Sequence, residues 1–130
     1  MNMTDTTRFY FFGTNGRPGH NLYSLTGREY SYDALKAEMG VNSIDGCYTN
    51  SYGAQGHGHC VHTPNGWTVL AVCDYSDDRR GGCKAAFMTP GLHTAEEMIA
   101  MATQYFPRKV QRIGPITLTP YTGDPAGRGY

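Results

Sequence analysis

The clearest hydrophobic pattern in this chain lies in residues 67–74. The odd-numbered and the even-numbered positions of this segment are both largely apolar. Successive side chains of a strand point to opposite faces, so a strand here would be buried on both sides. The pattern therefore predicts a central strand of a sheet.

A hairpin is predicted to lead into this strand. Residues 59–63 form the first arm, and the Asn65-Gly66 pair supplies the positive φ angles that a tight turn requires. With a two-residue turn at this pair, Cys60 would face Ala71 and His62 would face Val69. Cys73 would then lie diagonal to Cys60 on the same face.

Four further strands are expected. Residues 8–12 are aromatic on both faces of a strand, which suggests a strand covered on both sides. Residues 21–25 would return beside them as a hairpin, and residues 83–89 follow the central strand. Residues 110–121 offer a last strand. Pro115 interrupts it and cannot donate a ladder hydrogen bond, so an edge position is expected.

The strongest helix is predicted over residues 94–106. Thr94 and Glu97 have the spacing of a capping box, and Pro107 would end the run. Apolar residues repeat at helical spacing and would form one buried stripe. They are Ala95, Met98, Ile99, Ala102, Tyr105 and Phe106.

A second, short helix is predicted over residues 31–39, with Ser31 as its N-cap and Gly40 as its left-handed stop. Several strands with two helices and no regular alternation are typical of an α+β fold. We expect one domain over residues 1–121, with a mostly antiparallel sheet and the 94–106 helix packed on one face. Residues 122–130 are predicted to form a flexible tail.

Composition narrows the function classes. The chain has 130 residues, with 11 Lys and Arg against 11 Asp and Glu, so its formal net charge is zero. Generic nucleic-acid or anionic-membrane binders carry a basic excess, so neither class is expected. The N-terminal residues are polar and the longest aliphatic run covers only residues 69–73, so a cytoplasmic protein without a signal peptide or membrane span is predicted.

The four cysteines are Cys47, Cys60, Cys73 and Cys83, and no two of them have the C-x-x-C spacing. Free thiols in a reducing cytosol are therefore predicted. In the hairpin expected above, Cys60, His62 and Cys73 would share a face, and their side chains are of the kinds that Zn²⁺ prefers. No cofactor is predicted, and zinc at these three residues is the alternative.

A Cys-His hydrolase is a further alternative. Cys60 or Cys47 would be the nucleophile, a histidine the base, and Asp74 or Asp45 the group that orients it. Such residues meet in space, so their spacing in sequence does not identify them. No catalytic residue is assigned, because structural thiols are the plainer interpretation.

Charge concentrates in the segment that follows the predicted central strand. Arg79 and Arg80, with the amides of the two glycines that follow them, could hold a phosphate or carboxylate. The chain would then bind a nucleotide or another small anion. Asp77 and Asp78 could instead bind a divalent cation, and a solvated turn with mutually neutralising charges is the plain alternative.

Tyrosine is abundant, with 10 residues. Tyrosine provides a large amphipathic contact area at low entropic cost and is enriched at protein–protein interfaces. A tyrosine-rich recognition surface is therefore one interpretation. Its candidates are Tyr23, Tyr30, Tyr32, Tyr48, Tyr52, Tyr75, Tyr121 and Tyr130.

Residues 67–79 and 84–87, together with residues 8–10 and 16–20, resemble small uncharacterised proteins of bacteriophages and prophages. The resemblance spans roughly residues 8–115. It implies a phage context, in which proteins of this size often inhibit host machinery, including defence systems such as CRISPR effectors. It carries over no catalytic residue, because that group has no established activity.

The sequence therefore favours a small non-enzymatic protein that binds and inhibits a host protein or ribonucleoprotein complex, with an anti-CRISPR-like role as one candidate. The alternatives are the small-anion binder and the metal-dependent or Cys/His-dependent hydrolase. The residues predicted to contact the partner or ligand are Tyr48, Tyr52, Asp77, Asp78, Arg79 and Arg80.

Overall fold

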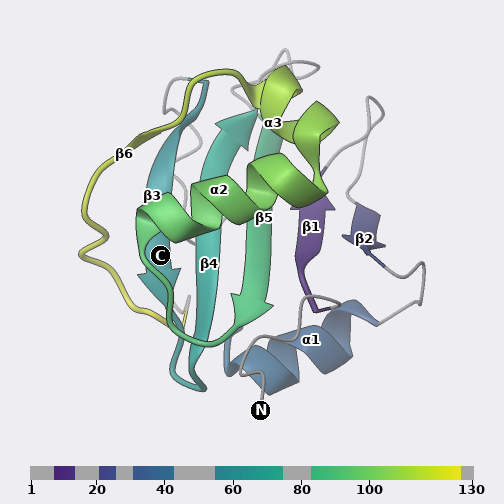
Figure 1. Ribbon diagram of the computed structural model, residues 1–130. Helices are drawn as coiled ribbons and strands as arrows, with labels where there is room; N and C mark the ends of the chain where they lie inside the picture. The colour runs from purple at the N-terminus through teal and green to yellow at the C-terminus, as the bar shows by residue number, and fades with distance from the viewer. Residues whose placement is uncertain (1–7, 14–20, 26–30, 43–54, 75–82, 127–130) are drawn as a thin grey trace.

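The computed structural model describes residues 8–13, 21–25, 31–42, 55–74 and 83–126. Strands and helices follow one another along these residues as Figure 1 shows. In chain order they are β1 (Tyr10–Gly13), β2 (Asn21–Ser24), α1 (Tyr32–Met39), β3 (His57–His62), β4 (Trp67–Asp74), β5 (Cys83–Pro90), α2 (Ala95–Tyr105), α3 (Pro107–Ile113) and β6 (Thr117–Leu118).

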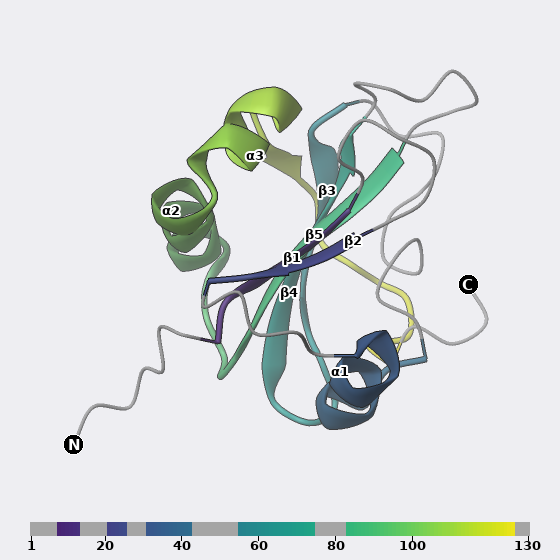
Figure 2. The same cartoon turned by 90° about the vertical axis from the view of Figure 1, so that its right-hand side faces the viewer.

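The strands form one sheet in the order β2-β1-β5-β4-β3-β6. Every neighbouring pair is antiparallel except β3 and β6, which run parallel. Helices α2 and α3 lie on one side of the sheet and α1 lies on the other (Figure 2). The predicted α+β fold, with its mostly antiparallel sheet and main helix across one face, is confirmed.

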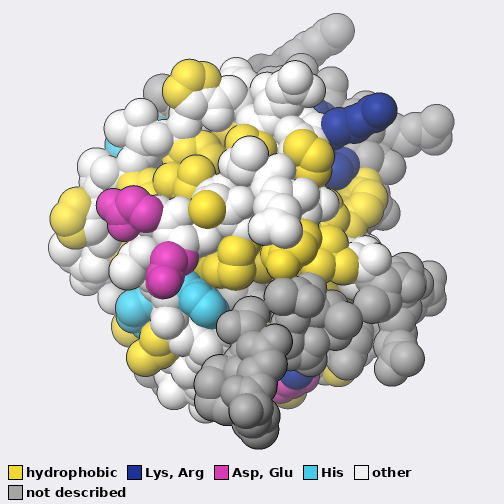
Figure 3. All heavy atoms as spheres, viewed as in Figure 1, with side chains coloured by type: hydrophobic (Ala, Val, Ile, Leu, Met, Phe, Trp, Pro, Cys, Tyr) yellow, Lys and Arg dark blue, Asp and Glu magenta, His cyan; other side chains and the backbone are white. Residues whose placement is uncertain are grey.

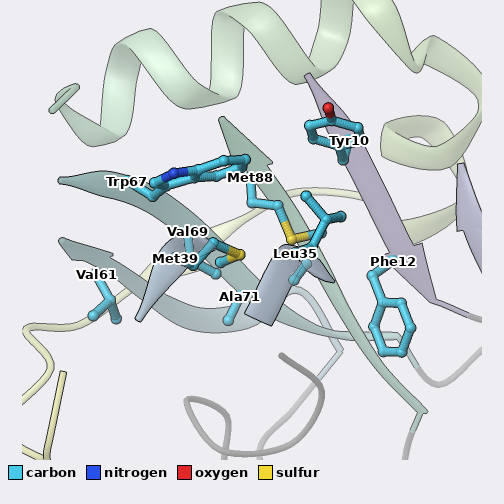
Figure 4. Packing of buried hydrophobic residues seen from close by; sticks show 10 residues of the cluster. Tyr10, Phe12, Leu35, Met39, Val61, Trp67, Val69, Ala71 and Met88 are labelled. Carbon is cyan, nitrogen blue, oxygen red and sulfur yellow. The ribbon is translucent and has the colours of Figure 1, made fainter. Parts of the chain in front are cut away.

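The α1-side core joins one face of the sheet to α1. Figure 4 shows Leu35 and Met39 beside Val69, Ala71 and Met88. Burying a large apolar side chain such as Leu35 stabilises the fold by about 1.5–3 kcal/mol. The members of this cluster are Tyr10, Phe12, Leu35, Met39, Val61, Trp67, Val69, Ala71, Ala86 and Met88.

The α2-side core occupies the opposite face of the sheet. Helix α2 contributes Met98 and Ala102, and α3 contributes Ile113. Leu70 and Val72 of β4 belong here, whereas the odd-numbered residues of β4 belong to the α1-side core. This division confirms the predicted central strand. The members are Phe9, Phe11, Leu70, Val72, Ala85, Phe87, Met98, Ala102 and Ile113.

Both predicted helices have the predicted caps. The hydroxyl of Ser31 accepts from the amide of Ala34 at 2.9 Å, and Gly40 ends α1 with φ 78°. In α2, Thr94 and Glu97 form the capping box, with hydrogen bonds of 2.8 and 3.1 Å. Among the described residues, no helix is long and apolar enough to cross a membrane.

The register predicted for the β3–β4 hairpin is wrong by one residue. Cys60 pairs with Leu70 and His62 with Thr68, rather than with Ala71 and Val69. The cause is the turn. It contains Pro64, Asn65 and Gly66, and it is closed by the Thr63 amide donating to the Trp67 carbonyl at 2.8 Å. Gly66 has φ 82°, as expected for the last position of a three-residue hairpin loop.

The strand predicted over residues 110–121 is also largely wrong. Residues 107–113 form α3, and only Thr117–Leu118 form a strand, which lies at the predicted edge position. Pro107 ends α2 as expected, but it also begins α3. Proline suits the first turn of a helix because the amide that it lacks would have no partner there.

Residues 122–126 begin the segment that was predicted to be a flexible tail. The hydroxyl of Tyr121, just before this segment, donates to the Asp124 carbonyl at 3.0 Å. The amide of Asn42 donates to the carbonyl of Ala126 at 2.8 Å, and Ala126 is buried. The flexibility of residues 127–130 stays a prediction.

Candidate binding site

Several connections leave the sheet at the same end. Asp74 at the end of β4 pairs with Cys83 at the start of β5, and Gly13 at the end of β1 pairs with Asn21 at the start of β2. The β1–β5 register places Gly13 on the Cys83 side of the sheet. In Figure 1 this is the upper end, where β3 also begins. We call these strand termini, together with Gly56 just before β3, the loop end.

Gly56 joins three strands at the loop end. Its amide donates to the Cys73 carbonyl of β4 at 2.8 Å, and its carbonyl accepts from the Thr117 amide of β6 at 2.9 Å. Its φ is 81°, and a Cβ atom at this position would lie 2.1 Å from the Pro115 carbonyl oxygen. Only glycine fits this close approach, so the backbone geometry here depends on it.

Gln55 ties α3 to the loop end. Its side-chain amide donates to the carbonyls of Arg112 at 3.1 Å and Ile113 at 2.9 Å. These carbonyls belong to the last turn of α3, where a helix has no internal donors for them. Gln55 and Gly56 precede the hairpin arm predicted over residues 59–63, and no local sequence pattern distinguishes them from their neighbours.

The six predicted contact residues lie outside the described residues. They are Tyr48, Tyr52, Asp77, Asp78, Arg79 and Arg80. The described residues that flank them do meet. Gln55 follows the segment that contains Tyr48 and Tyr52, and Asp74 precedes the segment that contains residues 77–80. The Gly56–Cys73 hydrogen bond joins these two parts of the chain.

Three of the candidate tyrosines lie in described segments, and each packs against neighbouring side chains. The Tyr23 ring lies 5.8 Å from the Phe11 ring, and the Tyr32 ring stacks on Phe12 at 4.9 Å between centroids. Tyr121 lies edge-on to His59 at 5.3 Å. Packing therefore accounts for Tyr23, Tyr32 and Tyr121. The candidates Tyr30, Tyr48, Tyr52, Tyr75 and Tyr130 lie outside the described residues.

The three candidate zinc ligands do not share a face. Cys60 and His62 point to the α2 side, because Cys60 packs against the α2-side core and the two residues are two positions apart. Cys73 is an odd-numbered, fully buried residue of β4 and points to the α1 side. The β3–β4 register differs by one residue from the predicted register, and such a shift moves every side chain of one strand to the opposite face relative to the other. The expectation that Cys60, His62 and Cys73 share a face is therefore wrong. Among the described side chains, no three His, Cys, Asp or Glu residues could hold a metal ion together.

The histidines near this sheet edge bind main-chain carbonyls. His62 Nε2 donates to the His93 carbonyl at 2.9 Å, and His59 Nδ1 donates to the Thr119 carbonyl at 2.9 Å. A carbonyl only accepts, so the ring nitrogen is the donor in each contact. His93 also lies 3.9 Å from the Glu97 carboxylate. These contacts join β3 to the segment before α2 and to the chain after β6.

Cys60 is a poor nucleophile. Burial raises the pKa of its thiol, and the charge of Glu96 raises it further. The thiol is therefore protonated at neutral pH, whereas the thiolate is the reactive form. The other candidates for a Cys-His site, Cys47, Asp45 and the side chain of Asp74, lie outside the described residues.

Comparisons with protein-family models, with curated proteins and with solved structures find no match to this chain.

Proposed function

We propose that this chain is a non-enzymatic binding protein whose macromolecular partner contacts the loop end of the sheet. The observation that carries the proposal is the 2.8 Å hydrogen bond from Gly56 to Cys73. It joins the two parts of the chain from which all six predicted contact residues extend. One partner surface could therefore contact both segments.

Chain length limits how far some of these residues lie from the loop end. Tyr52 lies three residues before Gln55. Asp77 lies three residues after the end of β4, and Arg80 three residues before the start of β5. Three fully extended residues span at most about 11 Å. These three residues therefore belong within the footprint of an ordinary protein–protein interface.

The residue types favour a protein or ribonucleoprotein partner. Tyrosine and arginine are enriched among residues that dominate binding energy, and Tyr48, Tyr52, Arg79 and Arg80 are of these types. The strand ends from which the two segments extend are fixed in the sheet by the Gly56–Cys73 hydrogen bond and the β4–β5 pairing. The phage resemblance suggests a host partner, with inhibition of a bacterial defence component as the biological role.

The test compares two variants in affinity capture from a bacterial lysate, followed by a binding measurement with the purified partner. The loop variant carries alanine at positions 48, 52, 77, 78, 79 and 80. The control variant carries Leu92→Ala and Glu96→Ala, two exposed residues outside the loop end: Leu92 follows the end of β5, and Glu96 lies in the first turn of α2. Both variants are first checked for wild-type thermal unfolding.

The proposal predicts that the loop variant binds the captured partner at least 100-fold more weakly, a loss typical of removing several central contacts. The control variant should bind within twofold of the wild type. A loop variant that binds as tightly as the wild type would overturn the proposal. If a nucleotide or inorganic phosphate binds at wild-type Arg79 and Arg80 and no macromolecule is captured, the small-anion alternative replaces it.

A further inference from the structure

Charge is unevenly distributed over this neutral chain. Between Glu97 and Asp124 there is no acidic residue, while Arg108, Lys109 and Arg112 all lie in α3. On the face shown in Figure 3, acidic side chains gather at the left and Lys and Arg side chains at the upper right. The upper part of this face is where Figure 1 places α3.

The basic side chains of α3 are held in defined positions. The Lys109 ammonium lies 4.3 Å from the centre of the Tyr23 ring and 5.2 Å from that of Phe11. Such cation–π contacts orient a charge without neutralising it. Arg108 is exposed to solvent. Arg108 therefore faces solvent from α3, and the half-buried Lys109 is fixed beside it against the sheet.

The acidic residues of α2 are too distant to screen them. Glu96 and Glu97 lie in the first turn of α2, which has 11 residues and ends just before α3. That length corresponds to about 16 Å. The Debye length in physiological salt is about 8 Å, so the field of these carboxylates is weak at α3.

Helix α3 is also continuous with the proposed binding site. The Gln55 side chain binds the last carbonyls of α3, and Gln55 directly precedes the glycine that joins β3 to β4. A partner that contacts the loop end would reach α3 next.

We propose that α3 extends the contact surface and that the partner presents a patch of protein carboxylates to Arg108 and Lys109. This inference rests on the proposed function and specifies the chemistry of the partner. Arginine binds carboxylates through two parallel hydrogen bonds. Complementary charge of this kind chiefly raises the association rate and excludes partners with basic surfaces.

A nucleic-acid partner fits these observations less well. Proteins whose binding to nucleic acid depends strongly on salt make about 6–10 phosphate contacts. Helix α3 has seven residues, is about 10 Å long and carries three basic side chains, and the chain as a whole has no net charge. A patch of this size matches part of a protein interface instead.

The test uses a fluorescent twelve-residue peptide that alternates glutamate and glycine, with oligothymidine of the same length as the competing class. Binding is measured by fluorescence anisotropy at two salt concentrations, and backbone amide shifts are followed by NMR. Arg108→Glu is compared with Lys36→Glu on α1. The two changes alter net charge equally, on opposite sides of the sheet.

We expect the peptide to shift the amides of α3, to bind more weakly as salt rises, and to lose at least tenfold in affinity with Arg108→Glu. Lys36→Glu should change its affinity less than twofold. Equal effects of the two variants, no shifts in α3, or tighter binding of oligothymidine at the same residues would each overturn the inference. The loop variant separates the two proposals, since it should lose the captured partner but keep the peptide-induced shifts in α3.

Discussion

Gly58 lies in β3 at a point where the backbone of β4 leaves no room for a side chain. A Cβ atom there would lie 1.8 Å from the Ala71 carbonyl oxygen and 2.9 Å from the Val72 Cα. The predicted hairpin arm began only at residue 59, and glycine is depleted in strands. In the structure residues 57 and 58 also belong to β3. The requirement for glycine arises from the partner strand, which a local pattern does not contain.

Gly58→Ala should therefore lower the free energy of unfolding by about 3 kcal/mol or more, because backbone must move to admit the methyl group. Gly66→Ala is the matched control. Gly66 has φ 82°, but nothing lies within 4 Å of a Cβ atom added there. Gly66→Ala should therefore lower the free energy of unfolding by only about 1 kcal/mol. Urea unfolding monitored by circular dichroism measures both. Equal losses in the two variants would contradict the close approach at Gly58.

At the scale of elements, Arg8 joins the start of β1 to α1. Its guanidinium forms a two-point ion pair with the Glu38 carboxylate, one contact being 2.9 Å long. It also lies 5.1 Å from the centre of the Trp67 ring. The hydrogen bonds from Arg8 lower the pKa of Glu38 below its ordinary value of 4.5. Folding therefore favours the ionised carboxylate.

A carboxyl whose pKa is lower in the folded state adds stability above its unfolded pKa, and this stability is lost as pH falls through the folded pKa. The wild type should thus exceed Glu38→Gln in unfolding free energy at pH 7, by less than about 1 kcal/mol because the pair is partly exposed and screened. The difference should shrink below pH 4.5 and in high salt. Urea unfolding of both proteins at several pH values from 7 to 3 measures this difference. If the difference in unfolding free energy stays the same at every pH, the ion pair does not contribute as described.

The helices were predictable because their signals are local. Ser31, Gly40 and the Thr94–Glu97 pair act within one turn of the helices that they delimit. The hairpin register was not predictable in the same way, since Asn-Gly is compatible with both a two-residue and a three-residue turn. Helix α3 was missed because Pro107 is both a stop signal for one helix and a favoured first residue for the next.

At the scale of the whole molecule, the α+β class followed from the order of the predicted elements, but the candidate site did not. The sequence predicted contact residues, among them tyrosines and arginines, in two segments 25 or more residues apart. The meeting of their flanks depends on the pairing of β3 with β4 and β6, including the Gly56 contacts. The same pairing placed Cys60 and Cys73 on opposite faces, which contradicts the alternative of a zinc site at Cys60, His62 and Cys73.

The central claim is that one partner contacts both segments at the loop end. The most direct test replaces Tyr48, Arg79 or Leu92, one at a time, with a photo-crosslinking amino acid. Leu92 is the control because it is 63% exposed and follows β5 at the opposite end of the sheet. Crosslinked products from a bacterial lysate are then identified by mass spectrometry. We predict that positions 48 and 79 capture the same partner and that position 92 does not; capture of that partner at position 92, or of different partners at positions 48 and 79, would contradict the account.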